Sequence, residues 1–198
     1  MEKKKGQIKE IEKPEDFKDV YQVFSGEPYN EKYTDKELQE IFEEYKEKGY
    51  IYGAYDEEKC LGLIALEDGA KKDHPIEFKE GEKVMYLADI AVLDSYRRTG
   101  LGTDLMIYGT LQSKVLGYQK LYMRTLEQDK SMSYRIARRI GFNQIPDVYQ
   151  MVERERTDGS RTAVKNIFLD CDLEALDIDI VRKTIDELYN NNKENERE

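Results

Sequence analysis

The segment 97–103, with the sequence Arg-Arg-Thr-Gly-Leu-Gly-Thr, combines residue types that can bind a phosphorylated anion. It stands between an apolar stretch that predicts a buried strand and a longer pattern that predicts a helix. The first turn of such a helix offers unpaired backbone N–H groups and a partial positive charge. Gly100 and Gly102 allow this backbone to approach a bulky anion, and Arg97 and Arg98 add positive charge. The segment is therefore predicted to bind a diphosphate group.

Two other phosphate-binding motifs do not match this segment. A Walker loop needs a Gly-Lys-Ser/Thr sequence, which does not follow here. The dinucleotide fingerprint Gly-x-Gly-x-x-Gly needs a glycine at position 105, where the chain has Leu105. From the residues alone a second interpretation stays open, in which Gly100 and Gly102 only make a tight turn and the two arginines are ordinary surface charges.

The surrounding pattern predicts the elements that must position this segment. Short apolar stretches between turn residues indicate strands at residues 7–11, 50–55, 60–66, 84–93 and 120–126. Apolar residues at helical spacing indicate helices at residues 14–24, 35–48, 101–116 and 131–140. An Asp-Gly turn indicates a final hairpin, formed by residues 149–156 and 162–172. One α/β (α+β) domain is expected over residues 1–175, followed by a C-terminal helix and polar tail over residues 176–198.

The composition limits the classes of partner. A chain of 198 residues suits one domain with a sizeable core. Its net charge of −10, from 42 acidic and 32 basic residues, repels nucleic acid and anionic membranes. No apolar run is long enough to span a bilayer, and the polar N-terminal residues lack the apolar core of a signal peptide. A soluble, cytoplasmic protein without nucleic-acid or membrane partners is therefore expected.

The cysteines and the single histidine do not suggest a metal site. Cys60 and Cys171 have no metal or redox spacing and lie in apolar, strand-like surroundings, so they are expected to be buried thiols. His74 lies in a polar loop and is expected to be exposed. With no cysteine–histidine pair in the pattern, a covalent acyl-enzyme is not expected.

Residues 97–102 resemble the acetyl-CoA motif Arg/Gln-x-x-Gly-x-Gly/Ala of the GNAT superfamily of N-acetyltransferases. The preceding stretch 87–92, Leu-Ala-Asp-Ile-Ala-Val, is similar to the fourth strand of that family. The stretch 137–142, Ala-Arg-Arg-Ile-Gly-Phe, is similar to the family's helix that ends in Gly-Phe. The order of elements over residues 7–172 also resembles the GNAT fold. The resemblance implies a single domain with a central mixed, mostly antiparallel sheet of about seven strands, flanked by helices and splayed between strands 4 and 5.

The resemblance also implies where acetyl-CoA, as co-substrate, would bind. The backbone of the fourth strand would pair with the amides of the pantetheine arm, and the N–H groups after that strand would hold the pyrophosphate. The cofactor-binding residues implied in this way are Ile90, Ala91, Val92, Arg97, Arg98, Thr99, Gly100, Leu101, Gly102 and Thr103. No metal is implied.

Two positions on and before the later helix depart from the pattern of many family members. The tyrosine that protonates the leaving thiolate in many members corresponds to Ala137. Tyr134 lies three residues earlier on nearly the same helical face, so it is our candidate for this acid. A role in the core or in a substrate pocket fits this tyrosine equally well. The asparagine that usually follows the fifth strand corresponds to Lys130 or Ser131.

The general base is also not evident from the pattern. The glutamate that many members carry on the fourth strand corresponds to Ala88. Asp89 is expected on the opposite face of the sheet because side chains alternate along a strand, whereas Tyr86 is expected to share the face of Ala88 and Ile90. Glu127, acting through a water molecule, is a second candidate base.

The resemblance therefore implies an N-acetyltransferase that moves an acetyl group from acetyl-CoA to a primary amine by direct attack. The acceptor would be a small-molecule or peptide amine, with its pocket around residues 29–33 and 148–152. The alternative is a GNAT-fold module that binds acyl-CoA as a sensor without turnover. The C-terminal hairpin and helix are a candidate homodimer interface.

Overall fold

The computed structural model describes residues 7–26, 29, 31–127, 132–155, 159–177, 179 and 181. The strands in this part of the chain are β1 (Gln7–Glu10), β2 (Gly49–Asp56), β3 (Lys59–Asp68), β4 (Val84–Val92), β5 (Lys120–Leu126), β6 (Asn143–Glu155) and β7 (Arg161–Asp172). The α-helices are α1 (Pro14–Tyr21), α2 (Asp35–Lys48), α3 (Leu101–Val115) and α4 (Met132–Arg139). Most boundaries agree closely with the sequence patterns, but β6 begins well before residue 149, and the predicted helix 14–24 is divided into α1 and a 3-10 turn (Gln22–Ser25).

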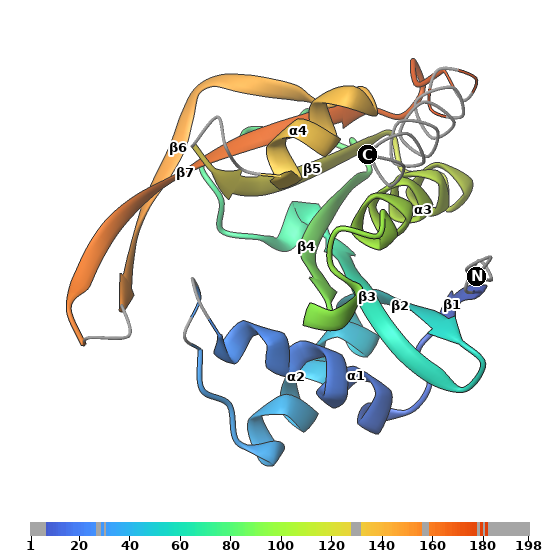
Figure 1. The fold of residues 1–198 in the computed structure, drawn as a ribbon. Coiled ribbons are helices and arrows are strands. Elements are labelled where there is room, and N and C mark those ends of the chain that lie inside the picture. The colour runs from blue at the N-terminus through green and yellow to red at the C-terminus, as the bar shows by residue number, and fades with distance from the viewer. Residues whose placement is uncertain are drawn as a thin grey trace, which may run out of the picture.

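The strands form one sheet in the order β1-β2-β3-β4-β5-β7-β6. β4 and β5 run parallel, and the other neighbouring pairs are antiparallel. Figure 1 shows this sheet between its helices, with β6 and β7 reaching out as a long curved hairpin. The mixed, mostly antiparallel sheet flanked by helices confirms the predicted fold class.

β4 and β5 pair along only part of their length. Their register runs from Val84 opposite Lys120 to Leu87 opposite Met123. Beyond this point β4 continues to pair with β3 as far as Val92, and β5 continues to pair with β7 as far as Leu126. Because the two strands are parallel, they separate at their carboxyl ends, which confirms the predicted splay.

The helices cover the two faces of the sheet separately. On the face we call the α3–α4 face, Leu105, Met106 and Ile140 are buried against sheet residues such as Ile64 and Leu87. On the opposite α1–α2 face, aromatic and aliphatic side chains of α1 and α2 are buried against alternating residues of β2 and β3. The residues of that second cluster include Phe17, Val20, Leu38, Phe42, Ile51, Leu63 and Ala65.

Helix α3 lies very close to β3 because of a glycine in its middle. A Cβ atom at Gly109 would stand 2.4 Å from Cδ1 of Ile64, which is closer than atoms can approach. This contact brings the helix down on the sheet, and the loop before α3 is thereby held beside the carboxyl end of β4. The close packing at Gly109 is therefore one of the contacts that position α3 and the loop of residues 97–103 before it.

The loop between β3 and β4 is anchored by His74, and the prediction that this histidine is exposed was wrong. Its Nδ1 lies 3.0 Å from the hydroxyl of Tyr122, and its ring packs edge-on against Tyr86, with ring centroids 4.7 Å apart. The Tyr122 hydroxyl donates to the carbonyl of Gly69 at 3.2 Å, so Nδ1–H of His74 is the donor to Tyr122. Burial, followed by the positive charges of Arg124 and Lys72, lowers the pKa of His74 to about 4.

The prediction of a C-terminal helix and tail lies mostly outside the described residues. Of residues 176–198, the structure describes Leu176, Asp177, Asp179 and Val181, and Val181 is buried against the α3–α4 cluster. The boundary at residue 175 and the role of this segment in dimerisation stay predictions. Among the described residues, no helix is both long and apolar enough to cross a membrane.

His74 should make the stability of the fold depend on pH in the mildly acidic range. The unfolded chain binds a proton on this side chain near pH 6.5, whereas the folded chain binds it only near pH 4. The free energy of unfolding therefore falls as the pH decreases from about 6.5 to about 4. In His74→Asn the amide can still donate to Tyr122 but does not titrate. Urea unfolding should show the wild type losing more stability than this variant across that window, and a difference that is the same at every pH would contradict the assignment.

Candidate cofactor and acceptor site

A cavity of about 310 Å³ opens beside the part of β4 that has separated from β5. Its walls come from the 3-10 turn after α1, from β4, from the loop and first turns of α3, and from α4. The lining residues are Val23, Phe24, Tyr29, Ile90, Ala91, Val92, Arg97, Gly102, Met106, Met132, Ser133 and Ile136. This volume is at the lower end of the range of small-ligand sites.

One wall of the cavity is the end of β4. Ile90, Ala91 and Val92 pair with β3 on one side, and no residue of β5 pairs with them on the other. Backbone groups of a strand point alternately to its two sides, so part of this stretch presents N–H and C=O groups toward the gap. An extended ligand that contains amide groups could continue the hydrogen bonding of the sheet here.

The loop between β4 and α3 makes a tight turn at the mouth of the cavity. Arg98 and Gly100 both have left-handed backbone conformations, with φ values of 64° and 92°. The N–H groups of Thr103 and Asp104 donate to the carbonyl of Gly100, at 2.9 and 3.0 Å. In the described part of the chain, the remaining N–H groups of this first turn have no backbone acceptor, so they are available to an anion.

The polar side chains of this loop are engaged in different ways. The guanidinium of Arg97 lies 3.0 Å from the carboxylate of Asp94, and about half of the Arg97 side chain is exposed to solvent. The hydroxyl of Thr99 donates to the carbonyl of Tyr96 at 2.7 Å, so it stabilises the turn. Positive charge for a ligand therefore comes from the exposed part of Arg97 and from the helix terminus.

The structure brings half of the predicted cofactor residues to the cavity wall. Ile90, Ala91, Val92, Arg97 and Gly102 line the cavity. The other predicted residues lie in the same loop or first helical turn but do not line the cavity; they are Arg98, Thr99, Gly100, Leu101 and Thr103.

Helix α4 contributes to the cavity through residues next to the predicted acid. Met132, Ser133 and Ile136 line it, whereas Tyr134 is half-buried against the α3–α4 cluster. Ala137, at the position of the usual tyrosine, is completely buried in that cluster. The hydroxyl that α4 presents at the cavity wall is therefore the one of Ser133.

Asp89 lies on the opposite face of the sheet from the one that strict alternation predicts. Ala65 pairs with Asp89 and Leu66 pairs with Leu87, so Ala88 is an extra residue in β4 and forms a β-bulge. Ala88 packs against the α1–α2 cluster, and Asp89 makes its hydrogen bonds on that same face. Ile90 instead packs on the α3–α4 face, so it does not share the face of Ala88.

The carboxylate of Asp89 is held by two tyrosines. The hydroxyl of Tyr21 donates to Oδ2 at 2.8 Å, and the hydroxyl of Tyr45 donates to the same oxygen. Burial and the negative charge of Asp89 raise the pKa of both tyrosines well above the ordinary value, so both stay protonated donors. Among the described residues no hydrogen-bond donor is assigned to Oδ1 of Asp89, which can therefore accept a proton or a hydrogen bond from a ligand.

Asp89 is connected to the cavity through a series of aromatic rings. Tyr21 packs on Phe24 with ring centroids 4.9 Å apart, and Phe24 packs on Tyr29 at 5.0 Å. Phe24 and Tyr29 both line the cavity. The tyrosine-held carboxylate thus lies behind the cavity wall formed by Phe24 and Tyr29.

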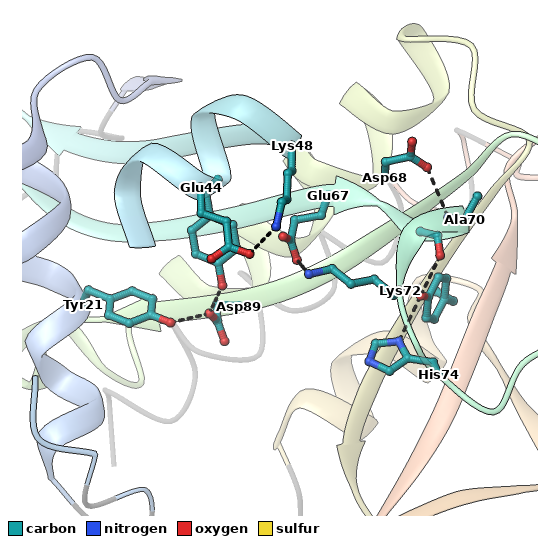
Figure 2. A network of polar contacts seen from close by, with 12 residues as sticks. Tyr21, Glu44, Lys48, Glu67, Asp68, Ala70, Lys72, His74 and Asp89 are labelled. Carbon is teal, nitrogen blue, oxygen red and sulfur yellow. Dashed lines mark hydrogen bonds and ion pairs between the residues drawn. The ribbon is translucent and has the colours of Figure 1, made fainter. Parts of the chain in front are cut away.

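A buried ion pair lies farther along the same face. Glu67 of β3 is 2% exposed, and its Oε2 lies 2.5 Å from Nζ of Lys72 in the loop before β4. Figure 2 shows this pair between Asp89 and His74. The pair closes the loop over the sheet, and it neutralises Lys72 locally.

Other candidates from the sequence do not lie at the cavity wall. Glu127 forms an ion pair with Lys165 of β7 and does not line the cavity. Lys130 and Ser131 lie outside the described residues. Cys60 and Cys171 are buried, as predicted, and burial raises the pKa of these thiols to about 11 and about 12, so neither is a ready nucleophile. Within the described ranges, no three metal-ligating side chains of the His, Cys, Asp and Glu types come together.

The separated parallel strands, the glycine-containing loop and the position of α3 together match one family. A family model with the description Acetyltransferase (GNAT) family matches residues 15–142, which is more than half of the chain. The chain therefore belongs to the GNAT family of acetyltransferases. A comparison with curated protein sequences found no match.

Solved structures with the same fold include several acetyltransferases. An N-acetyltransferase from Staphylococcus aureus Mu50 has a TM-score of 0.65 and 17% identity, and the match covers 86% of this chain and 99% of the other. The ribosomal-protein-S18-alanine N-acetyltransferase from Escherichia coli has a TM-score of 0.62 and 15% identity, with 85% and 94% covered. An acetyltransferase from Bacillus subtilis, solved in complex with CoA, has a TM-score of 0.58 and 17% identity, with 85% and 99% covered. At these identities the likeness extends to the fold.

Proposed function

We propose that this chain transfers an acetyl group from acetyl-CoA to a primary amine by direct attack of the amine on the thioester. The observation that carries the proposal is the cavity at the separation of β4 and β5, next to the first turn of α3. It combines an open strand edge, unpaired helix N–H groups and an arginine. Family membership supplies the expectation that the ligand is acetyl-CoA, and a solved neighbour contains CoA.

The cofactor side of the proposal rests on the backbone. The edge formed by Ile90, Ala91 and Val92 would pair with the amides of the pantetheine arm, and the N–H groups around Gly102 would hold the pyrophosphate. Arg97 would add charge, and the other residues of the loop, Arg98 to Thr103, would give the turn its shape. These roles are supported by the open space beside Gly102, whose added Cβ would meet only Val92 Cγ2, at 3.8 Å.

On the acceptor side, Asp89 is the base that we propose. Its Oδ1 would accept the proton that the attacking amine loses, directly or through a water molecule, while Tyr21 and Tyr45 hold Oδ2 in place. Tyr134 of α4 is the acid that we propose for the leaving sulfur. The placement of its neighbours Met132, Ser133 and Ile136 at the cavity wall supports a role for this helix.

Substitution of Gly102 tests the cofactor site. Gly102→Glu would place volume and negative charge where the pyrophosphate is expected, so acetyl-CoA affinity should fall at least about tenfold, which is about 1.4 kcal/mol. Gly102→Ala is the matched control, because its added methyl group makes only an ordinary contact with Val92. Calorimetric titration should give micromolar binding to the wild type and to the alanine variant. Absence of binding to the wild type would overturn the proposal, and binding without CoA release for any amine would indicate the sensor module instead.

Asp89→Asn tests the base. The substitution preserves the size of the side chain and its bonds to the tyrosines but removes the basic oxygen. The value of kcat/KM should therefore fall about 100-fold or more at neutral pH. Glu127→Gln is the comparison, because Glu127 was the other candidate and is paired with Lys165. An unchanged kcat/KM in Asp89→Asn would eliminate Asp89 as the base.

Tyr134→Phe tests the acid. If Tyr134 protonates the leaving thiolate, the transfer rate should fall about 100-fold, while acetyl-CoA binding measured by calorimetry should stay the same. Ser133→Ala provides the comparison, because Ser133 is the hydroxyl of α4 at the cavity wall. Retention of the full rate by Tyr134→Phe would remove this tyrosine from the mechanism.

A further inference from the structure

β4 and β5 each carry one charged residue close to the point where the two strands separate. Leu87 and Met123 form the last paired position of β4 and β5. Arg124 is the next residue of β5, and Asp89 follows Leu87 after the bulge at Ala88. An acidic and a basic residue therefore stand on the two strands just beyond the point where their pairing ends.

Both side chains lie on the α1–α2 face of the sheet. Arg124 stands opposite Phe168 of β7 and two residues after Tyr122, so it shares the face of these two rings. Tyr86 of β4 packs against the same rings. The pKa of Tyr86 is raised to about 12, chiefly by burial, while the charge of Arg124 lowers it and the charge of Asp89 raises it.

The charge of Arg124 is available to a ligand. Its Nη1 donates to Oε1 of Gln150 at 2.8 Å, which is a bond to a neutral group, and the side chain is exposed. Among the described residues, no carboxylate lies within ion-pair distance of it. Two other cations on this face already have acidic partners: Lys72 is paired with Glu67, and Lys120 with Glu82 and Asp170. With Nη1 bonded to this amide, Nη2 and Nε of the exposed guanidinium form the edge that could bind a carboxylate in a bidentate way.

We propose that the acceptor is a free amino acid, whose amino group faces Asp89 and whose carboxylate binds Arg124. This inference rests on the proposed function and adds the class of substrate to it. A ligand with its amine and carboxylate a few bonds apart would satisfy both charges, and its side chain would extend toward the aromatic rings of Phe24 and Tyr29. An N-terminal residue of a peptide has an amide where the free amino acid has a carboxylate, so it would leave Arg124 without an anion.

The test uses matched pairs of acceptors on the full chain. CoA release from acetyl-CoA is measured with the twenty amino acids and with their carboxamides, which differ only in the charge at the carboxyl end. Intrinsic reactivity favours the amides, because loss of the carboxylate lowers the pKa of the amino group. A preference of at least about tenfold in kcat/KM for one or more free acids would therefore reflect binding.

Three variants test whether Arg124 causes the preference for a free acid over its amide. Arg124→Gln should raise KM for the preferred free acid at least about tenfold and leave the amide almost unaffected, with kcat changed little. Arg124→Lys should retain part of the preference, because it keeps the charge but loses the planar fork. Arg161→Gln, which removes a largely exposed arginine from the outer end of β7, is the control and should behave like the wild type.

The outcomes separate this inference from the proposed function. The inference would be overturned if the protein used acids and amides equally, if it used amides better, or if Arg124→Gln changed both by the same factor. None of these outcomes would contradict the acetyltransferase proposal. If no amine releases CoA, the proposed function fails. Calorimetric titration of the CoA-saturated protein with each free acid and its carboxamide then decides whether the protein binds a free amino acid through its carboxylate. Binding of a free acid but not of its amide, lost in Arg124→Gln, would support the inference, and binding of neither would overturn it.

Discussion

The structure depends on the early end of pairing between β4 and β5. A parallel pair buried between two helical layers would ordinarily continue to the ends of its strands, because each unpaired backbone group in the interior carries a cost. Here the pairing stops after Leu87 and Met123, and the free edge of β4 becomes one wall of a cavity. An exposed strand edge is a hazard in most proteins. In this fold the edge is enclosed by the 3-10 turn after α1, by the first turns of α3 and by α4, so a ligand of matching shape can reach it and a second chain cannot readily add a strand.

The β-bulge at Ala88 determines on which face of the sheet Asp89 lies. One extra residue turns Asp89 onto the α1–α2 face, where two protonated tyrosines hold a single oxygen of its carboxylate. Without the bulge, Asp89 would lie in the apolar α3–α4 cluster, where burial of a charge without partners is very costly. The bulge thus moves the only carboxylate of β4 from the α3–α4 core to the α1–α2 face, and it turns Ile90 toward the α3–α4 face. Bulges next to active sites commonly re-aim side chains in this way.

The sequence predicted the features that are encoded by neighbouring residues. The loop of residues 97–103, the strand before it and the ending of α4 are local patterns, so the fold and the position of the candidate cofactor loop followed from them. The face of Asp89 could not be predicted, because the bulge depends on how β4 pairs with β3. His74 was expected to be exposed because its chain neighbours are polar, but its burial comes from Tyr122 and Tyr86, which are distant in sequence. The lining residues from α4 and the 3-10 turn, such as Ser133 and Phe24, carried no motif. The helical patterns of residues 131–140 and 14–24 predicted their elements but not their place at the cavity.

The net charge of the chain is a further constraint on how its ligands can bind. Both a CoA pyrophosphate and an acceptor carboxylate are anions, and a protein with a net charge of −10 repels them at long range. At physiological ionic strength this repulsion is screened beyond about 8 Å, so the groups within that distance decide affinity. The first turn of α3 and Arg97 provide such groups on one side of the gap, and Arg124 provides one on the other. The acidic surface also favours the approach of a positively charged amine. If the proposed ligands bind here, their anionic groups would therefore depend on these few local positive charges.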